Sequence, residues 1–233
     1  MKRFWDTAAT GKVGDRWQVM LDGKPMRLPG GAPLLLDNPA LAAAVAAEWQ
    51  AAGGAKGGEM SFADTPLTRI AGTAQERVAP RAEAVALELA RYGESDLLCY
   101  RAEEPDALVR RQAEQWQPWL DWAERRFGAR LAVTAGVMHQ AQPPAAVAAQ
   151  TVAGLAALGI MVPLTGSLVL GLAVADGALD AAEATRVSQL DELFQAELWG
   201  VEWESEERRV RVGGEIALAA RFIELSKQES SFF

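Results

Sequence analysis

The sequence predicts an α+β protein in which a small β-rich N-terminal domain precedes a larger, mostly α-helical C-terminal domain. Alternating apolar residues and turn signals gather in the first third of the 233 residues. The remainder consists mainly of apolar segments of helical length that begin or end at Pro or Gly. Half of the residues are apolar, which is ample for a buried core. We expect the boundary near residue 65, giving domains 1–65 and 66–233.

The β-rich part centres on an expected hairpin. Apolar residues alternate along 17–21, and the pair Asp22-Gly23 follows. An Asp-Gly pair favours a two-residue turn between antiparallel strands, because both turn positions need a positive φ. The return strand is expected over 24–28, and a further short strand over 34–36.

Helix start and stop signals define the next elements. Asn38 is a favourable N-cap with Pro39 at the first helical position, so a helix should begin there and stop at Gly53-Gly54. Thr65-Pro66 opens a second helical segment. The following elements are expected in order: an interruption at Pro80, a helix reaching Tyr92-Gly93, a strand at 97–100, a long helix from Pro105 to Phe127, and a strand near 131–134.

Residues 131–175 contain no Asp, Glu, Lys or Arg. Within them the 24 residues Val152–Ala175 are long enough to span a bilayer, which makes membrane association a competing hypothesis. Pro163 interrupts the run, Ala and Gly make up much of it, and no Lys or Arg brackets it. We therefore favour two buried helices joined near Pro163, and no membrane insertion. One helix should start at Pro143-Pro144, and the next at Pro163 or Thr165.

Asp180 should cap a further helix ending near Gly200, and a last helix should cover 215–227. Two faces are expected on the segment before Gly200. Helical spacing places one buried stripe at Val187, Leu190, Phe194 and Val201. It places a second face at Glu192, Gln195 and Trp199, which need not be buried.

The net charge of −8 is concentrated in one segment. Residues 176–207 hold ten acidic residues and one basic residue, Arg186, and so carry a charge of −9. Such runs usually form solvated helix faces, which we favour. The alternative is an acidic docking surface for a basic partner. An acidic chain of this size is not expected to bind nucleic acid.

Catalytic motifs of the common enzyme classes are absent from the sequence. His139 and Cys99 are single residues of their kinds, and we expect both to be structural, with no metal or cofactor. We therefore expect no enzyme. The alternative is a carboxylate-dependent hydrolase using acids of the 176–207 segment.

Eight tryptophans are the most informative aromatic residues. Trp116, Trp119 and Trp122 recur every three residues and form an oblique stripe on the long helix. We favour core packing for this stripe. An exposed aromatic patch for a protein partner is the alternative.

Seven blocks of the chain, in the same order, match a family of ATP synthase assembly chaperones that act on the α subunit of the soluble catalytic head. The blocks are VMLDGKPMRLP (19–29), EWQ (48–50), TPLTRIAGTA (65–74), DLLCYRA (96–102), RQAEQWQPWLDWAERRFGARLAVTAGV (111–137), TGSLVLGLAV (165–174) and SQLDELFQAELWGVEWESEERR (188–209). The chain resembles this family over about its whole length. It departs from the family's usual residues at Gln75, Glu76, Gln117 and Glu202.

The resemblance implies a chaperone that binds unassembled α subunit, shields its apolar interface and yields it to the β subunit without hydrolysing nucleotide. A holdase needs an apolar centre and a polar rim. We expect the partner-binding residues to be Glu192, Gln195, Glu197, Trp199 and Gly200, with Trp49 as a second candidate. For Trp49, packing of its helix against the sheet is the favoured alternative.

The compartment also follows from the resemblance. Eukaryotic relatives work in the mitochondrial matrix and carry a transit peptide, whereas this sequence shows none and is similar to bacterial members, which are cytoplasmic. A lone cysteine is in keeping with a reducing compartment. We expect a monomer.

Overall fold

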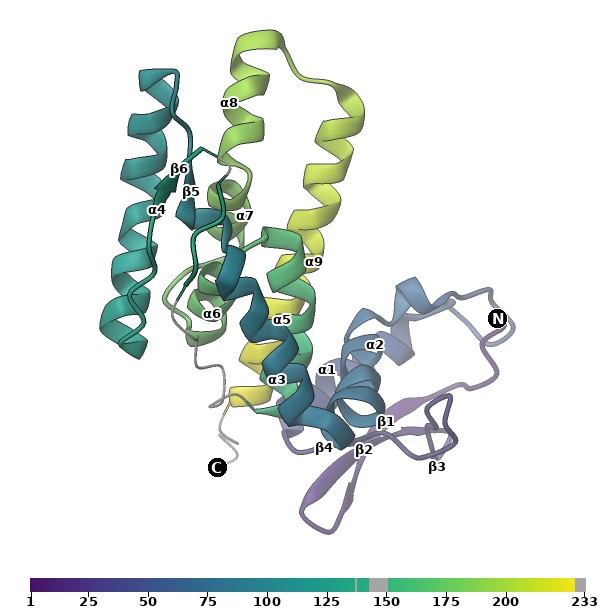
Figure 1. The fold of residues 1–233 in the computed structure, drawn as a ribbon. Coiled ribbons are helices and arrows are strands. Elements are labelled where there is room, and N and C mark those ends of the chain that lie inside the picture. Colours follow the sequence, from purple (N-terminus) through teal and green to yellow (C-terminus); the bar gives the residue numbers. More distant parts are fainter. Residues whose placement is uncertain (137, 143–150, 229–233) are drawn as a thin grey trace. The chain divides into compact units, whose positions relative to one another are not determined.

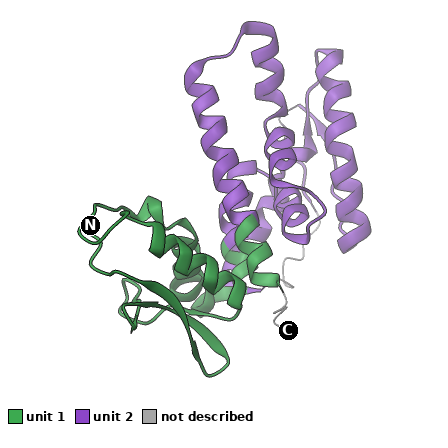
Figure 2. Ribbon diagram, turned by 180° about the vertical axis from the view of Figure 1, so that it is seen from behind, with its two compact units in different colours: residues 1–82, 152–156, 221–233 green, residues 83–151, 157–220 purple. Residues whose placement is uncertain are grey.

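A computed structural model describes residues 1–136, 138–142 and 151–228 (Figure 1). The chain divides into two compact units, shown in Figure 2. Unit 1 comprises 1–82, 152–156 and 221–233, and unit 2 comprises 83–151 and 157–220. An antiparallel sheet at the N-terminus and a mostly helical remainder confirm the predicted α+β class.

Unit 1 contains a four-stranded antiparallel sheet. Its strands are β1 (Ala8–Val13), β2 (Arg16–Leu21), β3 (Lys24–Pro25) and β4 (Leu35–Leu36). Strand β2 pairs with the other three. The expected turn between β2 and β3 is confirmed, because Asp22 and Gly23 both have positive φ, at 47° and 76°.

Two details of the sheet differ from the sequence expectations. Strand β1 was not expected, since its sequence AATGKV offers no apolar alternation and none of its residues is fully buried. The return strand is limited to Lys24–Pro25, although the Met26 N–H still donates to the Val19 carbonyl of β2 at 2.8 Å. Beyond Met26, Arg27 and Pro33 form an isolated antiparallel bridge, which is not part of a named strand.

The helices of unit 1 begin where the sequence indicates. Helix α1 (Pro39–Ala51) starts with the Asn38 side chain accepting a hydrogen bond from the Ala40 N–H, and helix α2 (Pro66–Thr73) follows Thr65. A π turn (Ala74–Val78) and a 3-10 turn (Ala79–Arg81) lead past Pro80, confirming the interruption. The buried core of unit 1 includes Trp5, Val19, Leu34, Val45, Leu67 and Ile70.

Unit 2 is built mainly of helices. The elements after residue 81 are α3 (Ala82–Ala90), β5 (Tyr100–Arg101), α4 (Asp106–Phe127), β6 (Thr134–Ala135), α5 (Val152–Thr165), α6 (Leu168–Asp176), α7 (Ala181–Ser188), α8 (Leu190–Trp199) and α9 (Trp203–Lys227). Ala82, the first five residues of α5 and the part of α9 from residue 221 onward belong to unit 1. Strands β5 and β6 form a short parallel pair. The strand expected at 97–100 is mostly a 3-10 turn, Leu97–Cys99, which the Asp96 side chain caps.

The uncharged tract forms two helices, as expected, but their junction differs. Pro163 lies inside α5, and the break comes at Gly166, whose φ is +65°. The Ser167 hydroxyl then accepts a hydrogen bond from the Leu170 N–H and caps α6. The helix expected from Pro143-Pro144 begins outside the described residues. In the described ranges, no helix combines the length and apolarity needed to cross a bilayer.

The last helices are arranged differently from the expectation. Asp180 caps α7 as predicted, but a break at Gln189 separates α7 from α8. Helix α9 begins at Trp203, twelve residues before the predicted start at 215, and Gly213-Gly214 lie inside it. Its first turns are solvent-exposed and therefore lack the apolar stripe that would reveal a helix. A Glu206–Arg209 ion pair at 2.6 Å supports them instead.

Close packing between α5 and α6 gives a stability prediction. A Cβ on Gly171 would lie 2.7 Å from Val162 Cγ2, whereas a Cβ on the exposed, helical Gly159 would meet nothing within 4 Å. We expect Gly171→Ala to lower the free energy of unfolding by about 1–3 kcal/mol through overpacking. Gly159→Ala, the matched control, should raise it by about 0.5–1 kcal/mol. Urea denaturation measures both, and equal effects would contradict the packing argument.

Candidate partner-binding surface

Helices α8 and α9 form a hairpin (Figure 1). The connection between them exposes large apolar side chains. We call residues 198–203 the hairpin tip. Trp199 is 78% exposed, Trp203 67% and Val201 61%, and Leu198 is also exposed. Gly200, with φ 93° and ψ 165°, ends α8 and turns these side chains away from a regular helix. Contiguous exposed apolar groups of this kind are typical of protein-binding sites.

Acidic side chains surround the tip. Glu202, Glu204 and Glu207 are exposed, and their carboxylates form no ion pair or hydrogen bond with any described residue. Glu192 is only loosely paired, with 3.7 Å between its Oε1 and Arg208 Nη2. The tip therefore combines an apolar centre with a negatively charged rim.

Four of the expected partner-binding residues lie together. Glu192, Gln195, Trp199 and Gly200 line a groove of about 360 Å³ between α8 and the start of α9, which we call the tryptophan groove. Glu202, Ser205, Arg208 and Arg209 complete its wall together with Ala196. The predicted face with Glu192, Gln195 and Trp199 is thus formed, because all three project from one side of α8.

Glu197 lies elsewhere. Its carboxylate accepts a hydrogen bond from Arg111 Nη1 of α4 at 2.7 Å, and this contact lowers the pKa of Glu197. Glu197 lines a second groove of about 330 Å³, which we call the arginine groove. Its lining residues are Arg111, Gln115, Arg186, Leu190, Leu193, Ala196, Glu197, Val201, Glu206 and Arg209.

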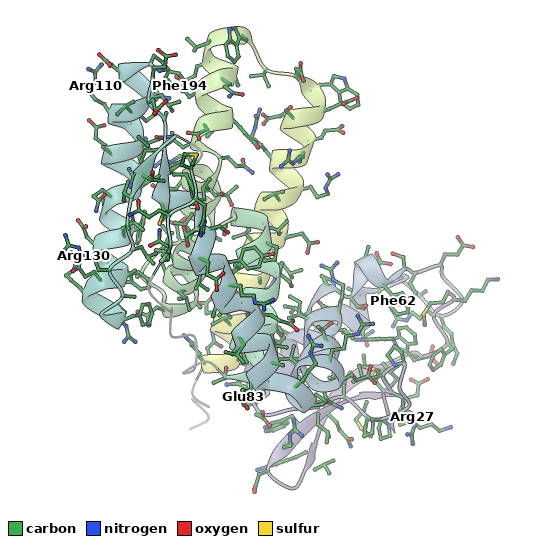
Figure 3. The ribbon with its side chains drawn as sticks, in the orientation of Figure 1. Arg27, Phe62, Glu83, Arg110, Arg130 and Phe194 are labelled. Carbon is green, nitrogen blue, oxygen red and sulfur yellow. The ribbon has the colours of Figure 1, made fainter. Side chains whose placement is uncertain are left out.

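The expected buried stripe is only partly correct. Val187, Leu190 and Phe194 are buried, and Phe194 lies on the side of α8 that faces α4 (Figure 3). Val201 is exposed, because α8 ends at Trp199 and Val201 follows Gly200 off the helix. The helical spacing that assigned Val201 to the stripe does not extend past this glycine.

Trp49 belongs to unit 1, whereas the other candidates belong to unit 2. Its side chain is 6% exposed, and its indole N–H donates to Thr68 Oγ1 at 2.9 Å. Its ring centroid lies 5.0 Å from that of Trp5. These contacts connect α1 with α2 and with the N-terminal segment, and they leave little of the indole for a partner.

The tryptophans of α4 are packed to different degrees. Trp116 is fully buried, and its indole N–H donates to the Val187 carbonyl at 2.9 Å, as expected for core packing. Trp119 and Trp122 are half-buried, with ring centroids 6.5 Å apart. This stripe therefore offers much less exposed aromatic surface than the hairpin tip.

Several acids of the 176–207 segment form ion pairs with arginines. Asp176 pairs with Arg126 and Glu183 with Arg186. A general acid requires a raised pKa, whereas that of Glu197 is lowered. Burial raises the pKa of two acids outside the segment: that of Asp96 to about 6, where backbone N–H groups hold its carboxylate, and that of Glu48.

The single cysteine and the single histidine have different surroundings. Cys99 is buried, and burial raises the pKa of its thiol to about 12. His139 Nδ1 lies 3.3 Å from the Tyr100 hydroxyl. Among the described residues, no group of three or more His, Cys, Asp or Glu side chains could hold a metal ion.

Sequence reasoning missed several residues of this surface. Leu198, Val201 and Trp203 were not selected, although Gly200 between two tryptophans is a signal for a helix end with exposed aromatic residues on both sides. Arg111 and Arg209 were also missed. Arg111 comes from α4 and is distant in sequence from α8, so no local pattern associates it with the surface.

An exposed, acid-rimmed aromatic tip on a helical scaffold is typical of proteins that bind other proteins. A family model described as ATP12 chaperone protein matches residues 2–124, and the chain belongs to this family. The crystal structure of Atp12 from Paracoccus denitrificans is 42% identical with a TM-score of 0.90, and the match covers 97% of this chain and 98% of that one. A variant of the same protein with lysine in place of an aspartate is also 42% identical, at the same coverages and a TM-score of 0.91.

A candidate chaperone from Agrobacterium tumefaciens is 39% identical, with a TM-score of 0.88. The match covers 97% of this chain and 86% of that one. The family consists of ATP synthase assembly chaperones, which are not catalytic. The predicted class of protein and the expectation that it is no enzyme are therefore confirmed.

Proposed function

We propose that this chaperone binds the unassembled α subunit of the ATP synthase catalytic head through the hairpin tip. The observation that carries the proposal is the exposure of Trp199 and Trp203 on adjoining helix ends. An α subunit without its neighbours exposes apolar surface that is destined for a subunit interface and drives aggregation. Tryptophan is the residue type most enriched at the energetic centres of protein interfaces.

The surface is suited to temporary binding. The tryptophan groove holds Glu192, Gln195, Trp199 and Gly200, and the unpaired acids around it complement basic groups on a client. A small apolar centre with a charged rim gives modest affinity, so the β subunit can displace the chaperone by offering a larger interface. We propose that it acts in this way as a cytoplasmic monomer, without cofactor, nucleotide hydrolysis or nucleic acid.

Light scattering of isolated α subunit tests the proposed function. Equimolar chaperone should suppress the scattering without ATP, and added β subunit should release the chaperone as an α–β species forms. Size-exclusion chromatography identifies the complexes. If α aggregates equally with and without the chaperone, and no α–chaperone complex elutes, the proposed function is wrong.

A further inference from the structure

The first half of α9 is largely exposed to solvent. Residues 203–211 are all exposed except Arg209, which is partly covered, and burial begins at Val212. The tryptophan groove and the arginine groove lie on two sides of the space between this half of α9 and α8. Ala196 and Arg209 line both grooves. The hairpin therefore offers two binding faces separated by only a few side chains.

The arginine groove gathers three guanidinium groups around an apolar wall. Arg111 lies over the Phe194 ring at 5.2 Å and is oriented by Glu197. Arg209 donates through Nε and Nη2 to Glu206, and its side chain is mostly covered. The apolar wall is formed by Leu190, Leu193, Ala196 and Val201.

The three arginines differ in how many of their N–H groups are not already used in hydrogen bonds within the chain. Arg186 is occupied on all its nitrogens by Glu183 and Gln115. Arg111 uses only Nη1 in hydrogen bonds to the described residues, and Arg209 leaves Nη1 without such a bond. A guanidinium carries five N–H donors in a fixed plane. Arg111 and Arg209 are thus held in place by one carboxylate each, with N–H groups left for another.

We propose that the arginine groove binds a segment of the α subunit that carries a carboxylate next to apolar side chains. The client carboxylate pairs with Arg111 and Arg209, and its apolar neighbours contact Leu193, Ala196 and Val201. Charge-assisted bonds from a preorganised arginine supply orientation as well as affinity. This inference rests on the proposed function and adds the chemistry of a second client segment.

In this arrangement, carboxylates of the chaperone itself compete with the client carboxylate for the two arginines. Glu197 and Glu206 already occupy one side of Arg111 and Arg209. Removing Glu197 should therefore free Arg111 for the client carboxylate and strengthen binding. A purely structural Arg111–Glu197 pair would respond in the opposite direction, because losing either partner would disturb the hairpin.

Biolayer interferometry with immobilised chaperone and isolated α subunit tests the inference. We expect the double variant Arg111→Gln/Arg209→Gln to bind at least about tenfold more weakly, the loss expected for charge-assisted hydrogen bonds. Glu197→Gln should bind severalfold more tightly. Arg125→Gln/Arg130→Gln is the matched control, with the same charge change on exposed arginines outside the groove, and should bind like the unchanged protein.

Several outcomes overturn the inference. Unchanged binding by the Arg111/Arg209 variant would show that the groove is not used. Weaker binding by Glu197→Gln, with a lowered melting temperature, would show that the pair is structural. Equal weakening by the Arg125/Arg130 control would show a dependence on net charge alone. In each of these cases the unchanged chaperone still binds the α subunit. If the proposed function itself is wrong, neither the unchanged chaperone nor any variant binds the α subunit.

Discussion

Replacing Trp199 and Trp203 together by serine should abolish the suppression of α-subunit aggregation and leave the fold intact. Both indoles are mostly exposed, so the folded chain loses little buried area when they are removed. Interface tryptophans at energetic centres cost at least about 2 kcal/mol each when truncated. Two such losses, if additive, would raise the Kd for the α subunit by roughly three orders of magnitude.

Light scattering and thermal denaturation should be measured on the same preparations. The matched control is Phe62→Ser/Leu87→Ser, which removes two side chains that are 69% and 64% exposed and lie outside the hairpin. We expect full activity from this control and an almost unchanged melting temperature for both proteins. Normal suppression by the tryptophan variant would place the client on another surface. A loss shared by both variants would mean that exposed apolar groups act without a specific site.

Local chemistry explains which parts of the fold were predictable. The turn at Asp22-Gly23 and the helix start at Asn38-Pro39 depend on residues adjacent in sequence, and both are found as expected. Strand β1 is stabilised by its pairing with β2, a partner that its own composition does not reveal. The start of α9 was placed too late because a solvated helix needs no apolar stripe.

The same distinction applies to the candidate surface. The spacing of Glu192, Gln195 and Trp199 places them on one helix side, which was visible in the sequence and agrees with the groove they line. The position of Glu197 depends on Arg111 of α4, a tertiary contact across 86 residues. Trp203 is exposed because the first turns of α9, up to residue 211, pack against little of the chain, and burial begins only at Val212. Neither property follows from local spacing.

The largest effect on stability is expected at Asp96. Its side chain is completely buried, and its two oxygens accept hydrogen bonds from the Leu98 and Val169 N–H groups, each at 3.0 Å. It thereby joins the 3-10 turn Leu97–Cys99 to the first turn of α6. Asp96→Ala would leave two buried N–H groups unpaired, at about 1–3 kcal/mol each.

We therefore expect Asp96→Ala to lower the free energy of unfolding by about 2–5 kcal/mol at neutral pH. Asp180→Ala is the matched control, because Asp180 also accepts a backbone hydrogen bond at a helix start but is exposed. Its loss should cost about 1 kcal/mol. Urea denaturation compares the two, and an Asp96 variant no less stable than the control would show that the buried carboxylate does not hold the elements together.

The pH dependence gives a second measurement on the same residue. Burial raises the pKa of Asp96 from 3.8 to about 6, although hydrogen bonds from Val169, Ser167 and Leu98 oppose the rise. The folded state therefore binds a proton on the Asp96 carboxylate more tightly than the unfolded state does. The contribution of Asp96 to the free energy of unfolding consequently increases as the pH falls from 6 toward 3.8. The difference in unfolding free energy between the unchanged protein and Asp96→Ala should widen by about 1 kcal/mol from pH 7 to pH 5. A constant difference would show that Asp96 keeps an ordinary pKa in the folded protein, and a narrowing one would show that its pKa is lowered; either result contradicts the raised pKa.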